Sequence, residues 1–422
     1  MKIQRTISPT AAPIDLIGIL HGIAGLFIGN RYIEKFESEI KDYFGIEHAF
    51  LVSSGKAGLT LILRALKSIH PERNQVLIPA YTCFSVPSAI IKAGLEVSLC
   101  DIDPATLDFD YKSLERSVNK HTLCIVSTHL FGIPSDVMRI KDLCEDKNIF
   151  VVEDAAQAMG GSFGCRYLGT IGDVGFFSLG RGKNITCGSG GIIVTNSDRI
   201  ACALEVEQTH AKDQNLMETL RNLLEVIISS ILIHPLLYWF PSGLPFLKLG
   251  ETVFHDDFPL KKLSGPQAGL LRGWQRNLES SNHKRRENAS YFIDQALLPG
   301  DKSASVPYLR LPFFIRDQEI RDSIYSRLQK DGIGLSRMYP SSINEIENLK
   351  AHFSGTEFPS AKSVSESILT LPTHHLLGKK DKEKICSKLK ETLGILPSGV
   401  NRLESSGCMQ NRLKNKKLSL MQ

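Results

Sequence analysis

Residues 150–195 read FVVEDAAQAMGGSFGCRYLGTIGDVGFFSLGRGKNITCGSGGIIVT, and this stretch decides both the fold and the chemistry. Its first part is an apolar strand that delivers Glu153 and Asp154 to its carboxyl end, followed closely by Gln157. Its second part holds one lysine, Lys183, in a segment with six glycines. Such backbone allows a planar ligand to approach closely, and a desolvated lysine can become a nucleophile. Taken singly, however, a carboxylate at this place can cap a helix, and a loop lysine is commonly solvated.

On both sides of this stretch, short apolar runs alternate with helical patterns. Strands are expected at Ala49–Val52, Gln75–Ile78, Glu96–Asp101, Leu123–Ser127, Phe150–Val152 and Gly191–Thr195, and helices at Glu34–Phe44, Ala57–Ser68, Ser85–Ala93 and Asp136–Asp146. Strands separated by helix-length crossovers indicate a mostly parallel sheet covered by helices on both faces, which is an α/β fold. Ligands of such sheets bind outside the carboxyl ends of the strands.

Two further segments follow strands and carry polar groups. Residues 53–58 read SSGKAG and connect a strand to a helix, so their backbone N–H groups are suited to a phosphate. Residues 127–132 read STHLFG and place His129 at another strand end. Each signal is weak alone, because a glycine-bearing turn is often a plain connector and an isolated histidine is more often structural.

Together, these segments supply the parts of a pyridoxal phosphate (PLP) site. Lys183 would form the Schiff base with the cofactor, and Asp154 would pair with the pyridinium nitrogen. The amides that follow Gly55 and the hydroxyl of Ser178 would take the phosphate. No one of these residues identifies the cofactor, but their order along the chain does.

The chain resembles the DegT/StrS-type family of sugar aminotransferases from about Gly29 to Glu391. The resemblance rests on SSGKAGLTLILRALK, VLIPAYTCFSVPSAIIKAGLEVSLCDID, THLFGIPSD, residues 151–186 and GSGGIIVTN, and on LSGPQAGLL, LQKDGIGLSRMYP and ILTLPTHHLL in the C-terminal part. It implies the aspartate aminotransferase fold (fold type I). By this resemblance the chain moves an amino group from an amino acid, glutamate by family likeness, to a keto sugar nucleotide.

The resemblance also assigns roles to individual positions. Lys183 and Asp154 are the catalytic residues that it implies, with Gln157 as a hydrogen-bond donor to the phenolic oxygen of the cofactor. The remaining positions implied to bind the cofactor are Gly55, Lys56, Ala57, Phe84, His129 and Ser178.

Three positions depart from the family pattern. Lys56 stands where a Thr or Ser is frequent, and Cys83 stands where an aromatic side chain usually stacks on the ring, which leaves its neighbour Phe84 as the expected aromatic. Leu260–Leu263 replaces an Asn-Tyr-Arg-Met stretch that reaches the phosphate in the partner subunit.

Composition excludes several other classes of protein. The chain has 422 residues, 42% of them hydrophobic, and a net charge of +5, most of which lies in its last 22 residues. The nearly neutral body argues against nucleic-acid binding. Nine cysteines without a CxxC pair argue against a disulfide framework or a zinc site, so no metal is expected. We expect a cytoplasmic protein, since the first residues have no apolar signal region.

We expect a large PLP-binding domain at 1–258, a smaller α/β domain at 259–397 and a disordered basic tail at 398–422. In the second domain, a long helix is predicted at Gly265–Leu297, followed by Tyr308–Ile315, Ile320–Asp331, Ile368–Leu371 and Lys380–Leu393 as strand and helix signals. The apolar segment Met217–Phe240 is interpreted as a buried or interface helix, with an interfacial membrane contact as the less favoured alternative.

Two other functions stay open at this stage. A PLP-dependent sugar dehydratase would use the same scaffold, but its family members replace the Schiff-base lysine with histidine, and this chain has Lys183. A regulatory protein that binds PLP or a sugar nucleotide without turnover would agree with Cys83 and with the altered Leu260–Leu263. The resemblance further implies a homodimer with shared sites, working in the synthesis of a polysaccharide, a surface glycan or a secondary-metabolite sugar.

Overall fold

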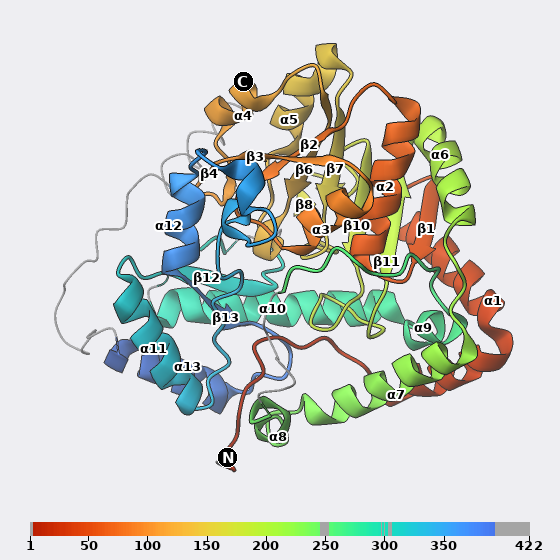
Figure 1. Cartoon of the computed structure of the whole chain (residues 1–422). Helices are drawn as coiled ribbons and strands as arrows, with labels where there is room; N and C mark the ends of the chain where they lie inside the picture. Colours follow the sequence, from red (N-terminus) through yellow and green to blue (C-terminus); the bar gives the residue numbers. More distant parts are fainter. Residues whose placement is uncertain (1–2, 245–252, 297, 299, 303–305, 393–422) are drawn as a thin grey trace.

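The computed structural model describes the chain except for residues 1–2, 245–252, 297, 299, 303–305 and 393–422. The predicted tail at 398–422 lies outside the described residues. Figure 1 shows a twisted central sheet with helices on both sides and a second, smaller group of helices and strands next to it. The division of the chain at residue 258 stays a prediction.

The central sheet has seven strands in the order β1-β11-β10-β7-β6-β2-β3. Only β11 runs antiparallel to its neighbours, β1 and β10, so the predicted mostly parallel α/β sheet is confirmed. Its strands are β1 (His48–Val52), β2 (Gln75–Pro79), β3 (Glu96–Cys100), β6 (Thr122–Thr128), β7 (Phe150–Asp154), β10 (Val174–Ser178) and β11 (Gly191–Thr195). β10 was not among the expected strands. Its VGFFS sequence lies within the glycine-rich segment, which obscures its pattern.

Helices cover the two faces of the sheet, and their bounds agree with the predicted pattern within a few residues for four of them. These are α2 (Gly55–Ile69), α3 (Ser85–Lys92), α5 (Val137–Cys144) and the C-terminal half of α1 (Leu16–Phe44). Two more, α4 (Tyr111–Ser117) and α6 (Asp198–Thr209), were not predicted. Short strand pairs, β4 (Ile102–Asp103) with β5 (Asp108–Phe109) and β8 (Ser162–Phe163) with β9 (Arg166–Tyr167), complete this part.

Helix α1 is much longer than the predicted Glu34–Phe44, because it begins at Leu16 and bends at Ile28. One side of its first half approaches α9 (Gly265–Leu270) so closely that a Cβ atom on Gly25 would lie 2.5 Å from the carbonyl oxygen of Gly265. The other side exposes apolar residues: Leu16, Ile17, Leu20, Ile23, Phe27 and Ile28. By length and composition, α1 is the one described helix that could cross a membrane, and most of its apolar stretch is not buried.

The apolar segment predicted at Met217–Phe240 forms α7 (Leu216–Leu232) and the short α8 (Trp239–Ser242). The prediction that it is buried is wrong for a single chain, since the buried side chains of α7 are Thr219, Leu223 and Val226. Its exposed apolar residues are Leu216, Met217, Leu220, Leu224, Ile228 and Ile231. The interface alternative stays a prediction.

The C-terminal part is built on a two-stranded antiparallel sheet. It contains β12 (Arg310–Phe314) and β13 (Ile368–Pro372), with α10 (Trp274–Ala296), α11 (Gln318–Lys330), α12 (Pro359–Ser367) and α13 (Lys379–Thr392). The single helix predicted at Gly265–Leu297 is divided into α9 and α10, because Gly273 adopts a left-handed conformation between them. The other predicted elements of this part are present.

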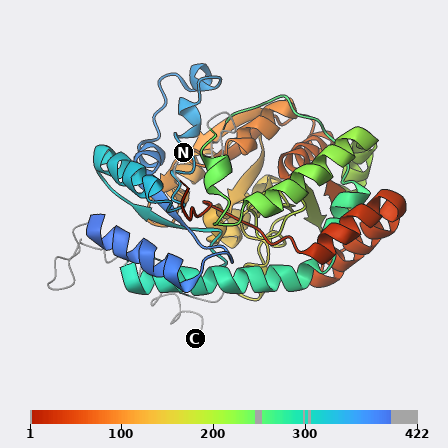
Figure 2. The same cartoon turned by 90° about the horizontal axis from the view of Figure 1, so that it is seen from below.

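The N-terminal segment crosses from the C-terminal part to the large sheet, as Figure 2 shows. The guanidinium of Arg5 donates two hydrogen bonds to Asp381 of α13, at 2.6 and 2.7 Å. Ile7 belongs to the apolar core of the C-terminal part, and the hydroxyl of Thr10 donates to the carbonyl oxygen of Gly182 at 2.6 Å. The first residues of the chain therefore join its last described helix to the loop that carries Lys183.

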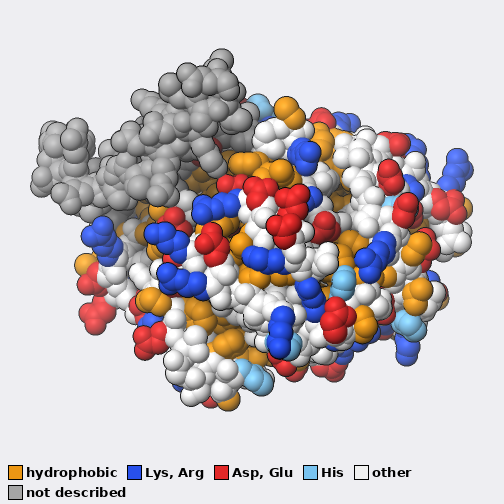
Figure 3. All heavy atoms as spheres, turned by 90° about the horizontal axis from the view of Figure 1, so that it is seen from above, with side chains coloured by type: hydrophobic (Ala, Val, Ile, Leu, Met, Phe, Trp, Pro, Cys, Tyr) orange, Lys and Arg blue, Asp and Glu red, His pale blue; other side chains and the backbone are white. Residues whose placement is uncertain are grey.

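Figure 3 shows the upper face of the molecule, where basic and acidic side chains are interspersed. This distribution agrees with the nearly neutral charge of the body of the chain.

Candidate active site

The predicted site residues meet at one edge of the sheet. Strands β1, β10, β7 and β6 run in the same direction, so their carboxyl ends face the same side. Gly55, Ser178, Asp154 and His129 follow or close these four strands in that order. The topology thus brings together groups that lie up to 123 residues apart in the sequence.

The two adjacent acids at the end of β7 serve different sides of the sheet, as expected for neighbouring strand residues. Asp154 is 5% exposed, and its carboxylate accepts a hydrogen bond from the backbone N–H of Ala156 at 3.0 Å. Burial raises the pKa of Asp154, while the positive charge of Lys183 works in the opposite direction. Asp154 is therefore the acid that faces the lysine.

Glu153 holds a loop instead. Its buried carboxylate accepts hydrogen bonds from the backbone N–H groups of Gly169, Ile171 and Gly172, at 2.9, 2.5 and 2.6 Å. It also contacts the imidazole of His129 at 2.9 Å. These contacts fix the loop between β9 and β10, and so the starting point of β10.

His129 is fully buried, and both of its ring nitrogens are engaged. The backbone N–H of Ser135 donates to Nδ1 at 3.1 Å, which leaves Nε2 to donate to Glu153. Its backbone N–H donates to the carbonyl oxygen of Asp154 at 3.1 Å. The structure thus places His129 beside the end of β7, where its backbone N–H is bonded to the backbone of Asp154. Its predicted position near the cofactor ring remains a prediction.

Lys183 lies in the glycine-rich loop between β10 and β11. Burial lowers the pKa of its amine, and the charge of Arg310 adds to this effect, whereas Cys83 and Asp154 raise the pKa. The loop is fixed from outside by Arg285, whose guanidinium donates to the carbonyl oxygen of Lys183 at 3.2 Å. A buried amine with a lowered pKa stays neutral more readily, and the neutral form is the nucleophile.

A cradle for a phosphate forms between α2 and β10. A Cβ atom on Gly55 would lie 3.0 Å from the Cβ atom of Ser178, so only glycine leaves this space open. Ser54 caps the helix by accepting from the N–H of Ala57 at 3.1 Å, so the amides of Gly55 and Lys56 are the ones that face outward. These amides and the Ser178 hydroxyl suit an anion, whereas the predicted contact of Ala57 would compete with the cap.

The side chain of Lys56 lies over the ring of Phe258, with its Nζ atom 4.2 Å from the ring centroid. Burial lowers the pKa of this lysine, and the neighbouring Cys83 raises it. Lys56 therefore brings a half-buried amine to the side of the cradle where the family more often has a hydroxyl.

The structure separates Cys83 from Phe84. Phe84 is 5% exposed and stacks on Tyr339 with ring centroids 6.3 Å apart, inside the apolar core. Cys83 is partly exposed, and it lies close enough to Lys183, Lys56 and Tyr339 to raise the pKa of each of them. Phe84 thus packs in the core beside Tyr339, and the ring contact predicted for it stays a prediction.

Gln157 is buried between two elements. Its amide oxygen accepts from the backbone N–H of Phe131 at 3.2 Å, and its amide nitrogen donates to the hydroxyl of Tyr339 at 3.0 Å. The predicted donor group is therefore directed toward Tyr339 and the centre of the site.

Sequence reasoning missed two residues at the site, Tyr339 and Arg310. Tyr339 belongs to the LQKDGIGLSRMYP motif, so its aromatic ring within a recognised motif was an available signal. Arg310 begins an apolar strand, and a charged residue at such a position is unusual enough to attract attention.

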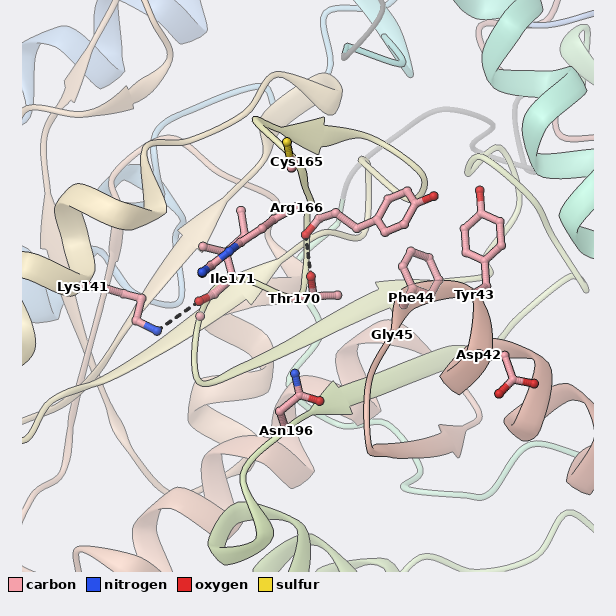
Figure 4. Close-up of a pocket in the computed structure, with 12 residues that line it drawn as sticks. Asp42, Tyr43, Phe44, Gly45, Lys141, Cys165, Arg166, Thr170, Ile171 and Asn196 are labelled. Atoms are coloured by element: carbon pink, nitrogen blue, oxygen red, sulfur yellow. Dashed lines mark hydrogen bonds between the residues drawn. The ribbon is translucent and has the colours of Figure 1, made fainter. Parts of the chain in front are cut away.

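A hollow of about 640 Å³ lies elsewhere, at the opposite edge of the sheet (Figure 4). Tyr43, Gly45, Arg166 and Asn196 are among its lining residues. Gly45 precedes β1 and Asn196 follows the antiparallel β11, which places the hollow at the amino ends of the parallel strands. It is separate from the site that contains Lys183.

The residues present at the carboxyl edge fit PLP. They offer a buried acid for a ring nitrogen, a lysine with a lowered pKa, and an open cradle that any Cβ atom on Gly55 would fill. A planar cofactor with a phosphate at one end and an aldehyde at the other requires these three features.

Comparison with known proteins agrees with this site. The chain matches the DegT/DnrJ/EryC1/StrS aminotransferase family over residues 23–235 and 250–390. A UDP-N-acetyl-3-dehydro-alpha-D-glucosamine 3-aminotransferase of Acidithiobacillus ferrooxidans is 25% identical over 384 residues, which cover 89% of this chain and 92% of that protein. A GDP-perosamine synthase of Vibrio cholerae is 32% identical over 170 residues, or 40% of this chain. That match spans about half of the relative, 46% of its length.

Solved structures show the same fold. Helicobacter pylori PseC, an aminotransferase involved in the biosynthesis of pseudoaminic acid, has a TM-score of 0.74 at 17% identity, covering 93% of this chain and 100% of that chain. The Escherichia coli GDP-4-keto-6-deoxy-D-mannose-3-dehydratase with bound hydrated PLP has a TM-score of 0.72 at 20% identity, covering 92% and 100%. The chain therefore belongs to the DegT/DnrJ/EryC1/StrS aminotransferase family and is a PLP-dependent transaminase.

Proposed function

We propose that this transaminase moves an amino group from an amino acid, glutamate by family likeness, to a keto sugar nucleotide. The observation that carries the proposal is the buried pair of Lys183 and Asp154 at the carboxyl edge of the sheet. The names of two relatives, a GDP-perosamine synthase and a UDP-sugar 3-aminotransferase, support a sugar nucleotide as the acceptor.

Each residue of the site has a distinct task in this proposal. PLP, when bound, supplies an electron sink for the carbon that exchanges the amino group. Asp154 would hold the positive charge of the ring nitrogen, and Lys183 would attach the cofactor and move a proton at its Nζ atom. The amides of Gly55 and Lys56, with the hydroxyl of Ser178, hold the phosphate.

The second candidate is a dehydratase that acts on a sugar nucleotide. A GDP-4-keto-6-deoxy-D-mannose 3-dehydratase of Yersinia pseudotuberculosis is 28% identical over 199 residues, so this reaction occurs among the relatives. A dehydratase of this scaffold needs a residue that cannot hold the cofactor covalently, whereas Lys183 is an amine with a lowered pKa. This difference favours amino transfer.

A binding protein without turnover is supported less. Leu260–Leu263, which replaces the expected partner contact, lies beside the end of β1 in its own chain, where the N–H of Ser53 donates to the carbonyl oxygen of Lys261 at 2.8 Å. This stretch therefore closes the turn that leads into the phosphate cradle. The complete set of Asp154, Lys183 and Ser178 favours catalysis over mere binding.

We further propose that the enzyme works as a cytoplasmic homodimer in the synthesis of a polysaccharide, a surface glycan or a secondary-metabolite sugar. The exposed apolar residues of α1 and α7 support the dimer, because a second copy would cover them.

The test follows the spectrum of the PLP-loaded protein after an amino acid is added. The wild type should convert the cofactor to its amine form with glutamate, and a keto sugar nucleotide should reverse the change. Lys183→Ala should reduce turnover by at least about 10³-fold, because it removes both the covalent attachment and the proton carrier. The matched control, Lys112→Ala, removes an exposed lysine and should react like the wild type.

Borohydride trapping and mass spectrometry give a second readout of the same proposal. The trapped adduct should be found on Lys183. Wild-type rates in Lys183→Ala, or an adduct on another residue, would refute the assignment. Release of water from the sugar instead of gain of nitrogen would favour the dehydratase.

A further inference from the structure

Arg310, the first residue of β12, is a buried guanidinium without a partner. Its side chain is 6% exposed, and its Nη1 atom has no hydrogen-bond partner. Within the described part of the chain, no hydrogen bond or ion pair involves its side chain. Buried charges are expensive unless they are paired, so an unpaired one indicates a missing ligand or a special task.

Other buried arginines of the chain are paired, which makes Arg310 distinct. Arg285 donates to the carbonyl oxygens of Leu309 and Ala11, at 2.9 and 2.8 Å. Arg321 contacts the carboxylate of Asp322 at 2.9 Å. The side chains of Arg285 and Arg321 thus have partners, although the Nε atom of Arg285 has none, whereas the side chain of Arg310 has no partner among the described residues.

Arg310 follows Leu309, and the guanidinium of Arg285 donates both to the carbonyl oxygen of Leu309, at 2.9 Å, and to that of Lys183, at 3.2 Å, so the start of β12 lies beside the loop of Lys183. The positive charge of Arg310 also helps to lower the pKa of the Lys183 amine. Its other charge neighbours include Tyr339 and Tyr238. Burial raises the pKa of both phenols above the ordinary value of 10.0, so they are neutral near pH 7 and cannot balance the charge. The missing anion must come from outside the described residues.

This anion is not the phosphate of the cofactor. The cradle of Gly55 and Ser178 lies at the start of α2, and the charge environment of Lys56 there involves Cys83 rather than Arg310. Arg310 is instead close to the amine of Lys183, where the nitrogen that is transferred must arrive. The anion is therefore attached close to the reacting nitrogen of a substrate.

We propose that Arg310 binds the α-carboxylate of the amino-acid donor and so selects the donor. In an α-amino acid the carboxylate is bonded to the carbon that carries the amine, which suits a cation next to Lys183. The diphosphate of a sugar nucleotide lies farther from the ring carbon that accepts nitrogen. A guanidinium also matches a carboxylate with two parallel hydrogen bonds. This assignment rests on the proposed transamination and specifies the subsite for its donor.

The first test measures melting temperature, which does not depend on turnover. Without ligand, Arg310→Met should melt at the same temperature as the wild type or higher, because it removes an uncompensated buried charge. Glutarate, a dicarboxylate without an amine, should raise the melting temperature of the wild type but not of Arg310→Met. A lower melting temperature of the ligand-free variant, or an equal response to glutarate, would overturn the proposal. The control Arg316→Met removes an exposed arginine next to the same strand and should respond like the wild type.

The second test separates the two half-reactions of the PLP-loaded enzyme. Arg310→Met should raise the KM for the amino acid by about 10- to 100-fold and leave the KM for the sugar nucleotide unchanged. Arg310→Lys keeps the positive charge but lacks the two parallel N–H donors of a guanidinium, so it should recover part of the affinity for the amino acid. A change confined to the sugar nucleotide would show that Arg310 binds its diphosphate instead, and the proposal would fail.

The outcomes also distinguish this proposal from the proposed function. If the wild type transfers nitrogen from no amino acid, the transaminase proposal fails. A glutarate response that requires Arg310 would still establish a carboxylate subsite in that case. If the wild type transaminates and Arg310→Met has an unchanged KM for the amino acid, only the proposal that Arg310 binds the donor carboxylate fails.

Discussion

At the residue scale, the adjacent acids of β7 show what a side chain gains from its position on a strand. Glu153 and Asp154 are alike in sequence terms, yet one fixes the loop before β10 and the other faces Lys183. The alternation of a strand separates their tasks. Cys83 and Phe84 also differ although they are neighbours, since Cys83 is partly exposed in the turn before α3 and the ring of Phe84 is buried in the core.

The lowered pKa of Lys183 predicts how PLP capture depends on pH. Only the neutral amine reacts, so the rate of covalent capture should fall as the pH falls through the pKa of this amine. Because burial lowers that pKa, the midpoint should lie below 10.5, the ordinary value for lysine. Asp154→Asn should move the midpoint to lower pH, since it removes a negative charge that raises the pKa.

Absorbance of the capture reaction in stopped flow checks this prediction. Asp142→Asn, at an exposed position on α5, is the control and should leave the midpoint unchanged. A midpoint at 10.5 in the wild type, or an upward shift in Asp154→Asn, would contradict the account.

Much of this site was predictable from the sequence, and the remainder was not, for a physical reason. Lys183, Asp154 and Ser178 lie within one short stretch of sequence, so they could be recognised together although β10, which Ser178 ends, was not predicted. Tyr339 and Arg310 come from a part of the chain more than 100 residues later, so only tertiary packing shows that Tyr339 contacts Gln157 and that Arg310 lies near Lys183.

At the element scale, α1 shows how glycines place a helix. Gly25 and Gly29 allow its backbone to approach Gly265 at the start of α9, with no room for a side chain between them. The apolar, glycine-rich first half of α1 lacks the polar face of a surface helix, which is why the sequence indicated only the amphipathic half from Glu34. The sequence also did not show that most apolar residues of α7 are exposed in a single chain, because an apolar helix is usually buried.

Gly25→Val should therefore destabilise the protein. The added atoms would meet the carbonyl oxygen of Gly265 at 2.5 Å or less, and such overpacking costs about 1–3 kcal/mol. Chemical denaturation followed by circular dichroism measures the loss. Asn30→Val places the same side chain at an exposed position of α1 and is the control. Equal stability of Gly25→Val and the wild type would show that α1 and α9 can separate freely.

At the scale of the whole molecule, the exposed apolar residues of α1 and α7 predict an assembly. The wild type should have the mass of two chains in light scattering. Leu224→Glu and Ile231→Glu, on the exposed side of α7, should shift the equilibrium toward one chain, because each buries a charge in the interface. Val206→Glu, an apolar-to-acid change on α6, is the control.

A single-chain mass in the wild type would reject the dimer. Co-sedimentation with lipid vesicles would then test the interfacial membrane contact as the alternative cover for α1 and α7.

The path of the N-terminal segment has a consequence for how the enzyme is made. Arg5 can bind Asp381 only after the ribosome has synthesised the 376 residues that follow it. At 5–20 residues per second, that interval lasts roughly 20–75 s on the ribosome. During this time the loop of Lys183 lacks its final support, so newborn chains should bind the vitamin B6 cofactor firmly only after translation has nearly finished.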